Sequence, residues 1–319
     1  MICRDRQGMR FAISPPMPSR TLVPAALAVA ASLFFCPHAS AQDPPPAGQP
    51  VLEPPAITLP PPQLDQVLVN LPTTLSLKKH KSYFRITHRF ARDLRRGTFG
   101  QLAEEFFSLD SGAVIGLEYR FGITTQLQAG IHRSIFGKTI ELFGRWDALA
   151  QDDTRPLGLS LLLSVEGQNN LRLDPQPGIS ATLSHVVGRL ALYATPAFVK
   201  EAHTPTLRVL HGDHSHGGGE EGDHEEGEQP GEDKNDTAFI GIGARLRVLD
   251  SVSVVVEGSP RIYGYRPDRA AWNFGVEKLT RGHVLQLNFG NSFATTPGQL
   301  ARGGSPHDIY LGFNMSRKW

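Results

Sequence analysis

The sequence predicts an all-β protein, an antiparallel up-and-down transmembrane β-barrel of about twelve strands. Three observations predict this fold. Apolar and polar residues alternate through most of the chain from Ser82 onward, short and long connections alternate between the expected strands, and the chain ends in an alternating stretch that closes on Trp319. Alternation with period two gives a strand one apolar and one polar face.

Residues 1–41 have the features of a secretory signal peptide. An apolar core at residues 22–35 follows Arg20, and Ala39-Ser40-Ala41 forms a cleavage site of the A-x-A type. We therefore expect this segment to be removed on export and the mature chain to begin near Gln42.

The cysteine content and the charge narrow the class of protein. Cys3 and Cys36 both lie in the predicted signal, so the mature chain has no disulfide and must be stabilised by an extensive hydrogen-bonded architecture. The formal net charge of +1 does not indicate a nucleic-acid partner. No apolar run reaches the length of about 20 residues that a membrane-spanning helix needs. Membrane insertion would therefore require a closed barrel, which pairs every backbone polar group.

Residues 42–68 are predicted to be a disordered, proline-rich periplasmic tether. Residues 43–62 include nine prolines in twenty positions, which excludes a helix or a central strand. An extended polyproline-type chain of this length would reach roughly 60 Å. An inert linker is the favoured interpretation, and a ligand for a periplasmic partner is the alternative.

Residues 69–319 are predicted to form the barrel, with strands of about ten residues, the length that a tilted strand needs to cross a bilayer. The expected strands lie near residues 82–90, 113–121, 127–131, 140–147, 157–165, 178–187, 189–199, 237–249, 252–263, 270–279, 283–293 and 308–319.

The connections differ in length in a regular order. Short periplasmic turns and long outer loops are the usual asymmetry of an outer-membrane barrel, whereas a soluble sandwich has no reason to sort its loops in this way. With both termini on the periplasmic side, the strand count must be even. The short links are expected at residues 122–125, 187–188, 250–251 and 280–282, and the long ones at 91–110, 167–177, 200–236 and 294–307.

The two faces of the expected strands differ in chemistry. One face is aliphatic and aromatic and is expected to contact lipid, and the other carries charges and is expected to line the lumen. Both signs of charge occur there, so an ion-paired, partly filled interior and an open channel are both compatible with the sequence. The charged positions are Glu118, Arg120, Glu141, Arg145, Asp147, Glu166, Arg245, Arg247, Glu257 and Glu277.

The closing strand, from Asp308 to Trp319, resembles the insertion signal of bacterial outer-membrane barrels. Apolar residues occupy every second position up to Met315, and the strand ends on an aromatic residue. Arg317 is a departure, because the signal usually has an apolar residue there. The resemblance implies recognition by the barrel-assembly machinery, with outer-membrane lipid as the other partner.

Several short runs carry a second resemblance, to an uncharacterised family of bacterial outer-membrane β-barrel proteins that is known as a domain of unknown function. It covers most of residues 69–319, implies an outer-membrane barrel, and supplies no substrate and no catalytic residue. The runs are Val69-Asn70-Leu71-Pro72-Thr73-Thr74, His88-Arg89-Phe90, residues 107–113, Gly122-Ile123-Thr124, Leu127 and residues 130–134.

A long outer loop at residues 200–236 is rich in histidine and acidic residues. From residue 211 to 236 it has ten acidic residues and one lysine, a charge of about −9 by simple count. Imidazole and carboxylate groups suit Zn²⁺, Ni²⁺ or Cu²⁺, but the spacing is not that of a structural zinc site. A solvated acidic loop is favoured over loosely bound metal. The candidate ligands are His211, Asp213, His214, His216 and His224.

Residues near the rim form a second candidate set, namely His88, Arg89, Asp110, His132 and Arg133. Asp110 is expected to pair with Arg89 or Arg133 and to fix the first long loop, and a structural ion pair is favoured over a substrate site. A lipid hydrolase would need Ser, His and an orienting group together. Ser184 and His185 are adjacent on one strand and so point to opposite faces. No catalytic residue is assigned.

The preferred function is passive: a pore or scaffold of the bacterial outer membrane, without cofactor or enzymatic activity and with an unknown substrate. Capture or uptake of a transition metal through the histidine-rich loop is the first alternative. An outer-membrane hydrolase is the second and less favoured one.

Overall fold

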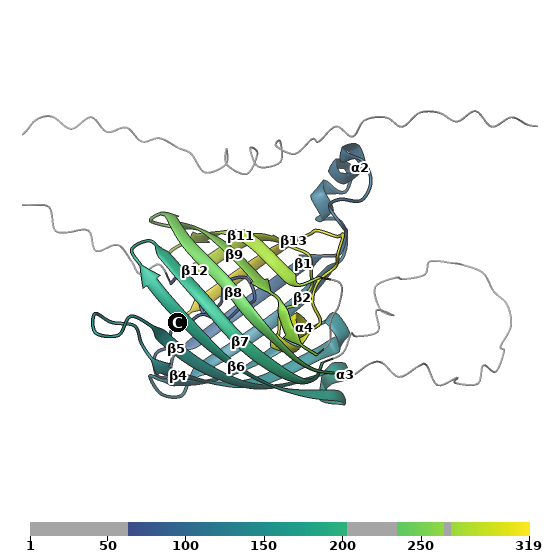
Figure 1. Ribbon diagram of the computed structural model, residues 1–319. Coiled ribbons are helices and arrows are strands. Elements are labelled where there is room, and N and C mark those ends of the chain that lie inside the picture. The colour runs from purple at the N-terminus through teal and green to yellow at the C-terminus, as the bar shows by residue number, and fades with distance from the viewer. Residues whose placement is uncertain (1–62, 203–234, 265–268) are drawn as a thin grey trace, which may run out of the picture. The chain divides into compact units, whose positions relative to one another are not determined.

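A computed structural model describes residues 63–202, 235–264 and 269–319, and it shows a closed barrel of antiparallel strands (Figure 1). The sheet has 13 strands, of which β10 only prolongs the wall beside β8, so twelve form the ring. The ring closes because β1 pairs with both β2 and β13. The strands are β1 Ser82–Phe90, β2 Ala113–Gly122, β3 Leu127–Ser134, β4 Thr139–Leu149, β5 Gly158–Gly167, β6 Leu173–Val187, β7 Leu190–Ala202, β8 Asn235–Leu249, β9 Val252–Ser259, β10 Arg261–Tyr263, β11 Ala271–Leu279, β12 His283–Gly290 and β13 Tyr310–Lys318.

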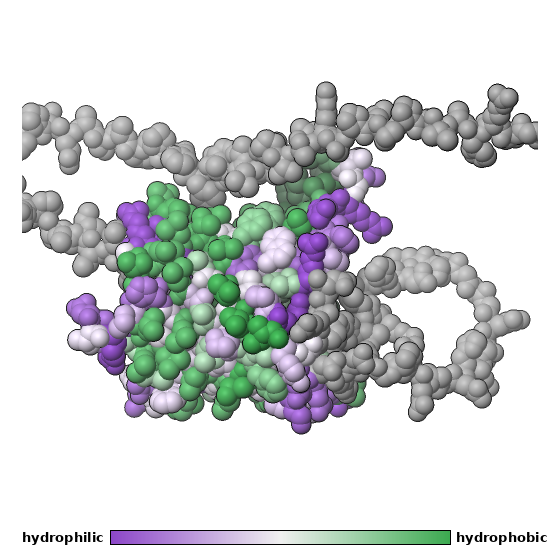
Figure 2. Space-filling model, viewed as in Figure 1, coloured by the Kyte–Doolittle hydropathy of each residue, from purple (hydrophilic) through white to green (hydrophobic). Residues whose placement is uncertain are grey.

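The wall has an apolar outer face and a polar inner face, and the predicted fold class is confirmed. In β2, Leu117, Tyr119 and Phe121 are exposed on the outside, while Glu118 and Arg120 between them are buried. Figure 2 shows apolar side chains spread over the outer surface of the strands that face the viewer. An apolar surface of this extent is unfavourable in contact with water and favourable in contact with the hydrocarbon of a lipid bilayer.

The strand ends define two ends of the barrel. We call the end with Ser82 and Lys318 the turn end, and the opposite end the loop end. The parity of connection lengths holds with three exceptions. One is the link between β5 and β6 at the loop end, which was expected to be long at residues 167–177 and is reduced to residues 168–172. Residues 150–157, at the turn end, form a longer link than residues 135–138 at the loop end.

β6 begins five residues before its predicted start at residue 178. Pro175 and Pro177 suggest a loop here, but this part of β6 is paired with β5. Pro177 pairs with Val165 of β5, whereas pairing with β7 first appears at Gly178. Proline is tolerated near the beginning of a strand, where the loss of one N–H donor disturbs the ladder least.

β13 shows how the closing strand accommodates a charge. Asn314 and Ser316 are buried in the lumen, and Phe313 and Met315 lie on the other face. Arg317 is exposed at the turn end, and its guanidinium lies 5.8 Å from the centre of the Trp319 ring. A cation at this end of the strand keeps its charge outside the hydrocarbon.

The helices are short and lie in the connections of the loop end. None of those in the described ranges is long and apolar enough to cross a membrane. They are α2 Phe99–Glu104, η1 Phe106–Ser108, η2 Phe136–Lys138, α3 Gln168–Leu171 and α4 Pro297–Ala301.

Candidate functional site

The lumen is occupied by the segment that precedes the first strand. Residues 64–75, called the plug below, form a narrow hairpin in which Leu68 N–H donates to the Leu71 carbonyl and Thr73 N–H to the Gln66 carbonyl. Leu68, Val69 and Leu71 at its tip are 0–1% exposed. The predicted tether boundary at residue 68 is therefore wrong: the last residues assigned to the tether lie inside the barrel.

Four arginines of the wall hold the plug, and all four are at most 1% exposed. Arg85 donates to the Val69 carbonyl at 3.0 Å, and Arg245 donates to the Val67 carbonyl at 2.7 Å. Arg89 donates to the Asn70 side chain at 2.9 Å. Guanidinium groups suit this task because they present several donors in a fixed plane and stay charged.

The fourth arginine, Arg145, reaches both arms of the hairpin. It donates to the Gln66 side chain at 3.2 Å and to the Leu75 carbonyl at 3.1 Å. Its charge is balanced by Asp147, 2.6 Å away. Arg245 is balanced in the same way by Glu277, at 2.7 Å. Burial of such cations requires these counter-charges, since an unpaired buried charge is strongly unfavourable.

One carboxylate of the wall binds the tip of the hairpin. Glu257 in β9 accepts hydrogen bonds from the backbone N–H groups of Val69, Asn70 and Leu71, each at 3.0 Å. The side-chain amide of Asn273 adds a fourth bond at 3.1 Å. Four donors thus solvate a buried negative charge without a cation among them.

Apolar contacts between the plug and the wall add to these hydrogen bonds. Leu68 and Leu71 belong to a continuous buried apolar cluster that includes Tyr193 and Phe239 of the wall. Beneath the two leucines, β8 carries Gly243 and Gly241. A Cβ atom at Gly241 would approach Leu71 side-chain atoms at 2.5 to 3.3 Å, so glycine provides the space that the leucine fills.

A second insertion enters from the loop end. The connection between β12 and β13 folds inward at α4, whose Leu300 and Ala301 join the same apolar cluster. Glu166 in β5 accepts from Gly298 N–H at 3.0 Å and from Arg302 at 3.2 Å. Segments of the chain therefore enter the lumen from both ends.

The wall of β1 to β4 carries a separate charged group. Glu118 pairs with Arg85 at 3.0 Å and with Arg120. Arg120 also lies over the rings of Tyr83 and Phe143, at 5.5 and 5.0 Å. These contacts neutralise Glu118 within the wall, and they do not reach the plug directly except through Arg85.

The predicted lumen charges are placed as follows. Glu118, Arg120, Glu141, Arg145, Asp147, Arg245, Arg247, Glu257 and Glu277 are all buried, as are Glu166 and Arg89.

The predicted rim pair of Asp110 with Arg89 or Arg133 is wrong. Asp110 is exposed. Arg89 turns into the lumen and donates to Asn70 and Asn314. Arg133 donates to the backbone carbonyls of Ser134 and Thr139. Burial places Arg89 where amide oxygens, and not a surface carboxylate, are within reach.

The predicted metal ligands, His211, Asp213, His214, His216 and His224, lie outside the described residues. Within the described ranges, no group of three or more His, Cys, Asp or Glu side chains is arranged to hold a metal ion.

The adjacent Ser184 and His185 do not form a hydrolytic pair. The Ser184 hydroxyl is buried in the lumen, 2.5 Å from the hydroxyl of Thr74. The His185 ring instead contacts the Pro156 carbonyl, at 2.7 Å. Neighbouring residues of a strand face opposite ways, which separates the two groups.

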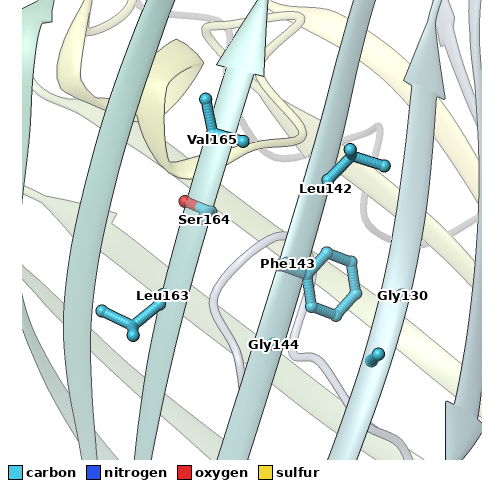
Figure 3. A pocket seen from close by; sticks show the side chains of 8 residues that line it. Gly130, Leu142, Phe143, Gly144, Leu163, Ser164 and Val165 are labelled. Carbon is cyan, nitrogen blue, oxygen red and sulfur yellow. The ribbon is translucent and has the colours of Figure 1, made fainter.

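The outer wall has a hollow of about 480 Å³ over β3, β4 and β5 (Figure 3). The residues that line it include Leu142, Leu163, Ala129 and Gly144. It presents few polar groups and faces hydrocarbon, so the lumen is the stronger candidate for a functional site.

The plug was not recognised from the sequence. Its signal is a short apolar run on either side of Asn70, and the structure shows that Val67 and Pro72 of these two runs face each other across the hairpin. Such a run is also typical of a strand or a linker. Its role as a plug depends on partners far along the chain, which a local pattern does not reveal.

Comparison with known protein families covers both the barrel and most of the plug. A family model described as a membrane bound beta barrel domain (DUF5777) matches residues 65–319, which include most of the plug. No curated protein sequence matches the chain.

Solved structures of several outer-membrane proteins are similar in outline. The NanC porin has a TM-score of 0.44 at 8% identity, covering 75% of this chain and 100% of that one. Phospholipase A from Escherichia coli has a TM-score of 0.38 at 8% identity, covering 79% and 97%. Omp33 from Acinetobacter baumannii has a TM-score of 0.36 at 8% identity, covering 77% and 100%.

Proposed function

The chain belongs to the family of membrane bound beta barrel domains (DUF5777), and from this premise we propose that it is a bacterial outer-membrane pore that its own plug keeps closed. The turn end would face the periplasm, in keeping with the usual asymmetry of turns and loops. The observation that carries the proposal is the convergence of four buried arginines on residues 64–75.

The plug is bound without being part of the wall. Its one described bridge, between Val67 and Pro72, lies within the hairpin, and it contributes no strand to the ring. The ring closes through β1 and β13 alone. The plug can therefore leave the lumen without breaking a strand pair. Water that enters the lumen can then solvate the charged wall side chains that had bound the plug.

The role is passive in this proposal, and no enzymatic activity is assigned to the chain. The wall residues that hold the plug bind it through hydrogen-bond donors and acceptors. They become free to bind a solute only when the plug leaves.

A disulfide between plug and wall tests the proposal. The hydroxyls of Thr74 and Ser184 lie 2.5 Å apart, so cysteines at both positions are within range of a disulfide. A chain of residues 42–319 contains no other cysteine. Planar-bilayer conductance of the refolded T74C/S184C variant should show openings when reduced and none when oxidised.

The single variants T74C and S184C serve as controls and should conduct equally under both redox conditions. Equal conductance of the oxidised and reduced double variant would contradict closure by the plug. Silence of the reduced protein at all voltages would favour a scaffold over a pore.

The metal hypothesis for the histidine-rich loop stays a prediction. Calorimetric titration of Zn²⁺ and Ni²⁺ into the peptide of residues 210–236 tests it. Absence of heat at micromolar ion would remove the hypothesis.

A further inference from the structure

We propose that the lumen wall is a binding site for short peptides with branched apolar side chains, and that the plug occupies this site in cis. The inference rests on the proposed function, because the site becomes accessible only when the plug has left. Short peptides of this kind would then be the solutes that the open pore binds.

The wall recognises mainly the backbone of the plug. Wall side chains donate to five of its carbonyl groups, and Glu257 accepts from three of its N–H groups. Four further contacts go to plug side chains. A backbone-directed site is tolerant of sequence, because every peptide has the same N–H and C=O groups. The carbonyl groups are those of Leu64, Val67, Leu68, Val69 and Leu75.

The polarity of the site fits a peptide better than other small solutes. Glu257 requires donors, whereas Arg85 and Arg245 offer donors within the same lumen. An anion would satisfy the arginines and repel Glu257. A carbohydrate could satisfy both kinds of group, but it has no side chain to fill the apolar part of the site.

The apolar part of the site consists of two hollows in the wall, one at each of two glycines. Gly241 and Gly243 of β8 leave space that Leu71 and Leu68 fill. The adjoining surface includes Tyr193 and Phe239, which are 3% and 1% exposed while the plug is in place. With the plug removed, this surface would contact water, so a ligand that covers it with apolar side chains is favoured.

The test uses the full mature chain and converts the plug into a separate ligand after folding. Lys78 and Lys79 are exposed at the turn end, between the plug and β1. A recognition sequence for a specific protease is inserted between them, the protein is folded in detergent, and the link is cut. The fragment that contains the plug then stays in the lumen by non-covalent contacts alone.

Displacement of this fragment by added compounds is measured by size-exclusion chromatography. The competitors are the peptide of residues 63–76, a scrambled peptide that keeps leucine at the positions of Leu68 and Leu71, and maltose. We expect both peptides to displace the fragment with affinities within about tenfold of each other, since backbone contacts are common to both. Maltose should not displace it.

N-methylation identifies the contacts. Methylation of the peptide at Val69, Asn70 and Leu71 removes the donors for Glu257 and should weaken competition by about tenfold or more. Methylation at Thr74, outside the Glu257 contact, is the matched control and should have a much smaller effect.

Three results would overturn the inference: displacement by maltose at the same concentration, competition by the native sequence alone, or failure of every peptide to displace the fragment. Conductance of the cut protein separates this inference from the proposed function. A barrel that conducts after loss of the fragment, yet binds no peptide, keeps the plugged pore and removes the peptide site. A barrel that exchanges peptides but never conducts keeps the peptide site and removes the plugged pore.

Discussion

The backbone N–H of Asn70 lies 3.0 Å from both carboxylate oxygens of Glu257, a residue 187 positions later in the chain. Glu257 is 3% exposed, and its hydrogen-bond partners among the described residues are backbone and side-chain amides. Its negative charge is thus stabilised largely by the plug. This dependence makes Glu257 the most direct point at which to loosen the plug without altering the ring.

The variant E257Q should loosen the plug. Glutamine keeps the shape of the side chain but removes the charge that strengthens the bonds to residues 69–71. We expect the plug to be bound more weakly by about 2 kcal/mol, or roughly 30-fold in the population of the open state. Hydrogen exchange of the amides at residues 64–75 measures this population.

The matched control for E257Q is E141Q. Glu141 is also a buried carboxylate of the wall, and it makes no hydrogen bond to the plug in the part of the chain that the structure describes. E141Q should leave amide exchange of the plug unchanged. Equal protection of the plug in E257Q and the parent protein would contradict the role given to Glu257.

Substitution of Gly241 by valine should displace the tip of the plug. The added side chain would occupy the space that Leu71 fills, and overpacking of this kind destabilises by about 1–3 kcal/mol. Gly144 is the control, because a Cβ atom there meets nothing within 4 Å. Amide exchange of the plug should increase in G241V and not in G144V. Faster exchange in both variants would indicate a general loss of wall stability.

The ion pair of Arg245 and Glu277 should be sensitive to loss of one partner. Both side chains are fully buried and 2.7 Å apart. E277A leaves Arg245 without its counter-charge, which should lower the free energy of unfolding by about 3–5 kcal/mol. In the double variant R245M/E277M no buried charge is left unpaired, so most of that loss should be recovered. Urea unfolding in detergent micelles measures both values, and equal destabilisation of the two variants would count against this account.

Leu163 tests the lipid-facing wall. It lies in the middle of β5 and is 63% exposed on the outer face. Arginine at this position should destabilise the barrel by about 2–4 kcal/mol in a bilayer, because its charge would be near the membrane midplane. Phe99, 75% exposed in α2 outside the strands, is the control. F99R should have little effect on unfolding in lipid, and an equally small effect of L163R would argue against burial of this face in hydrocarbon.

The family resemblance and the strand pattern together allowed the ring to be predicted in some detail. Every expected strand has a counterpart in the structure, and the largest difference in a strand boundary is at β6, which begins five residues before its expected start. The strand pattern does not predict which groups bind each charged side chain. Arg89 was expected to meet Asp110 at the rim, yet it bonds to Asn70 and Asn314 inside. Sequence distance gives no guide to such contacts, since any two inward positions of a closed ring can face a common insert.

The sequence by itself determined which side of each strand is apolar, because period-two alternation is a local property that the extended backbone converts directly into two faces. It thereby also determined that charged side chains line the interior. Only the tertiary structure decided what those charges bind. The plug has no periodic pattern, and its partners, from Arg85 to Lys318, come together only when the ring closes around it. Closure of the barrel is therefore the step that turns a row of buried charges into a binding site.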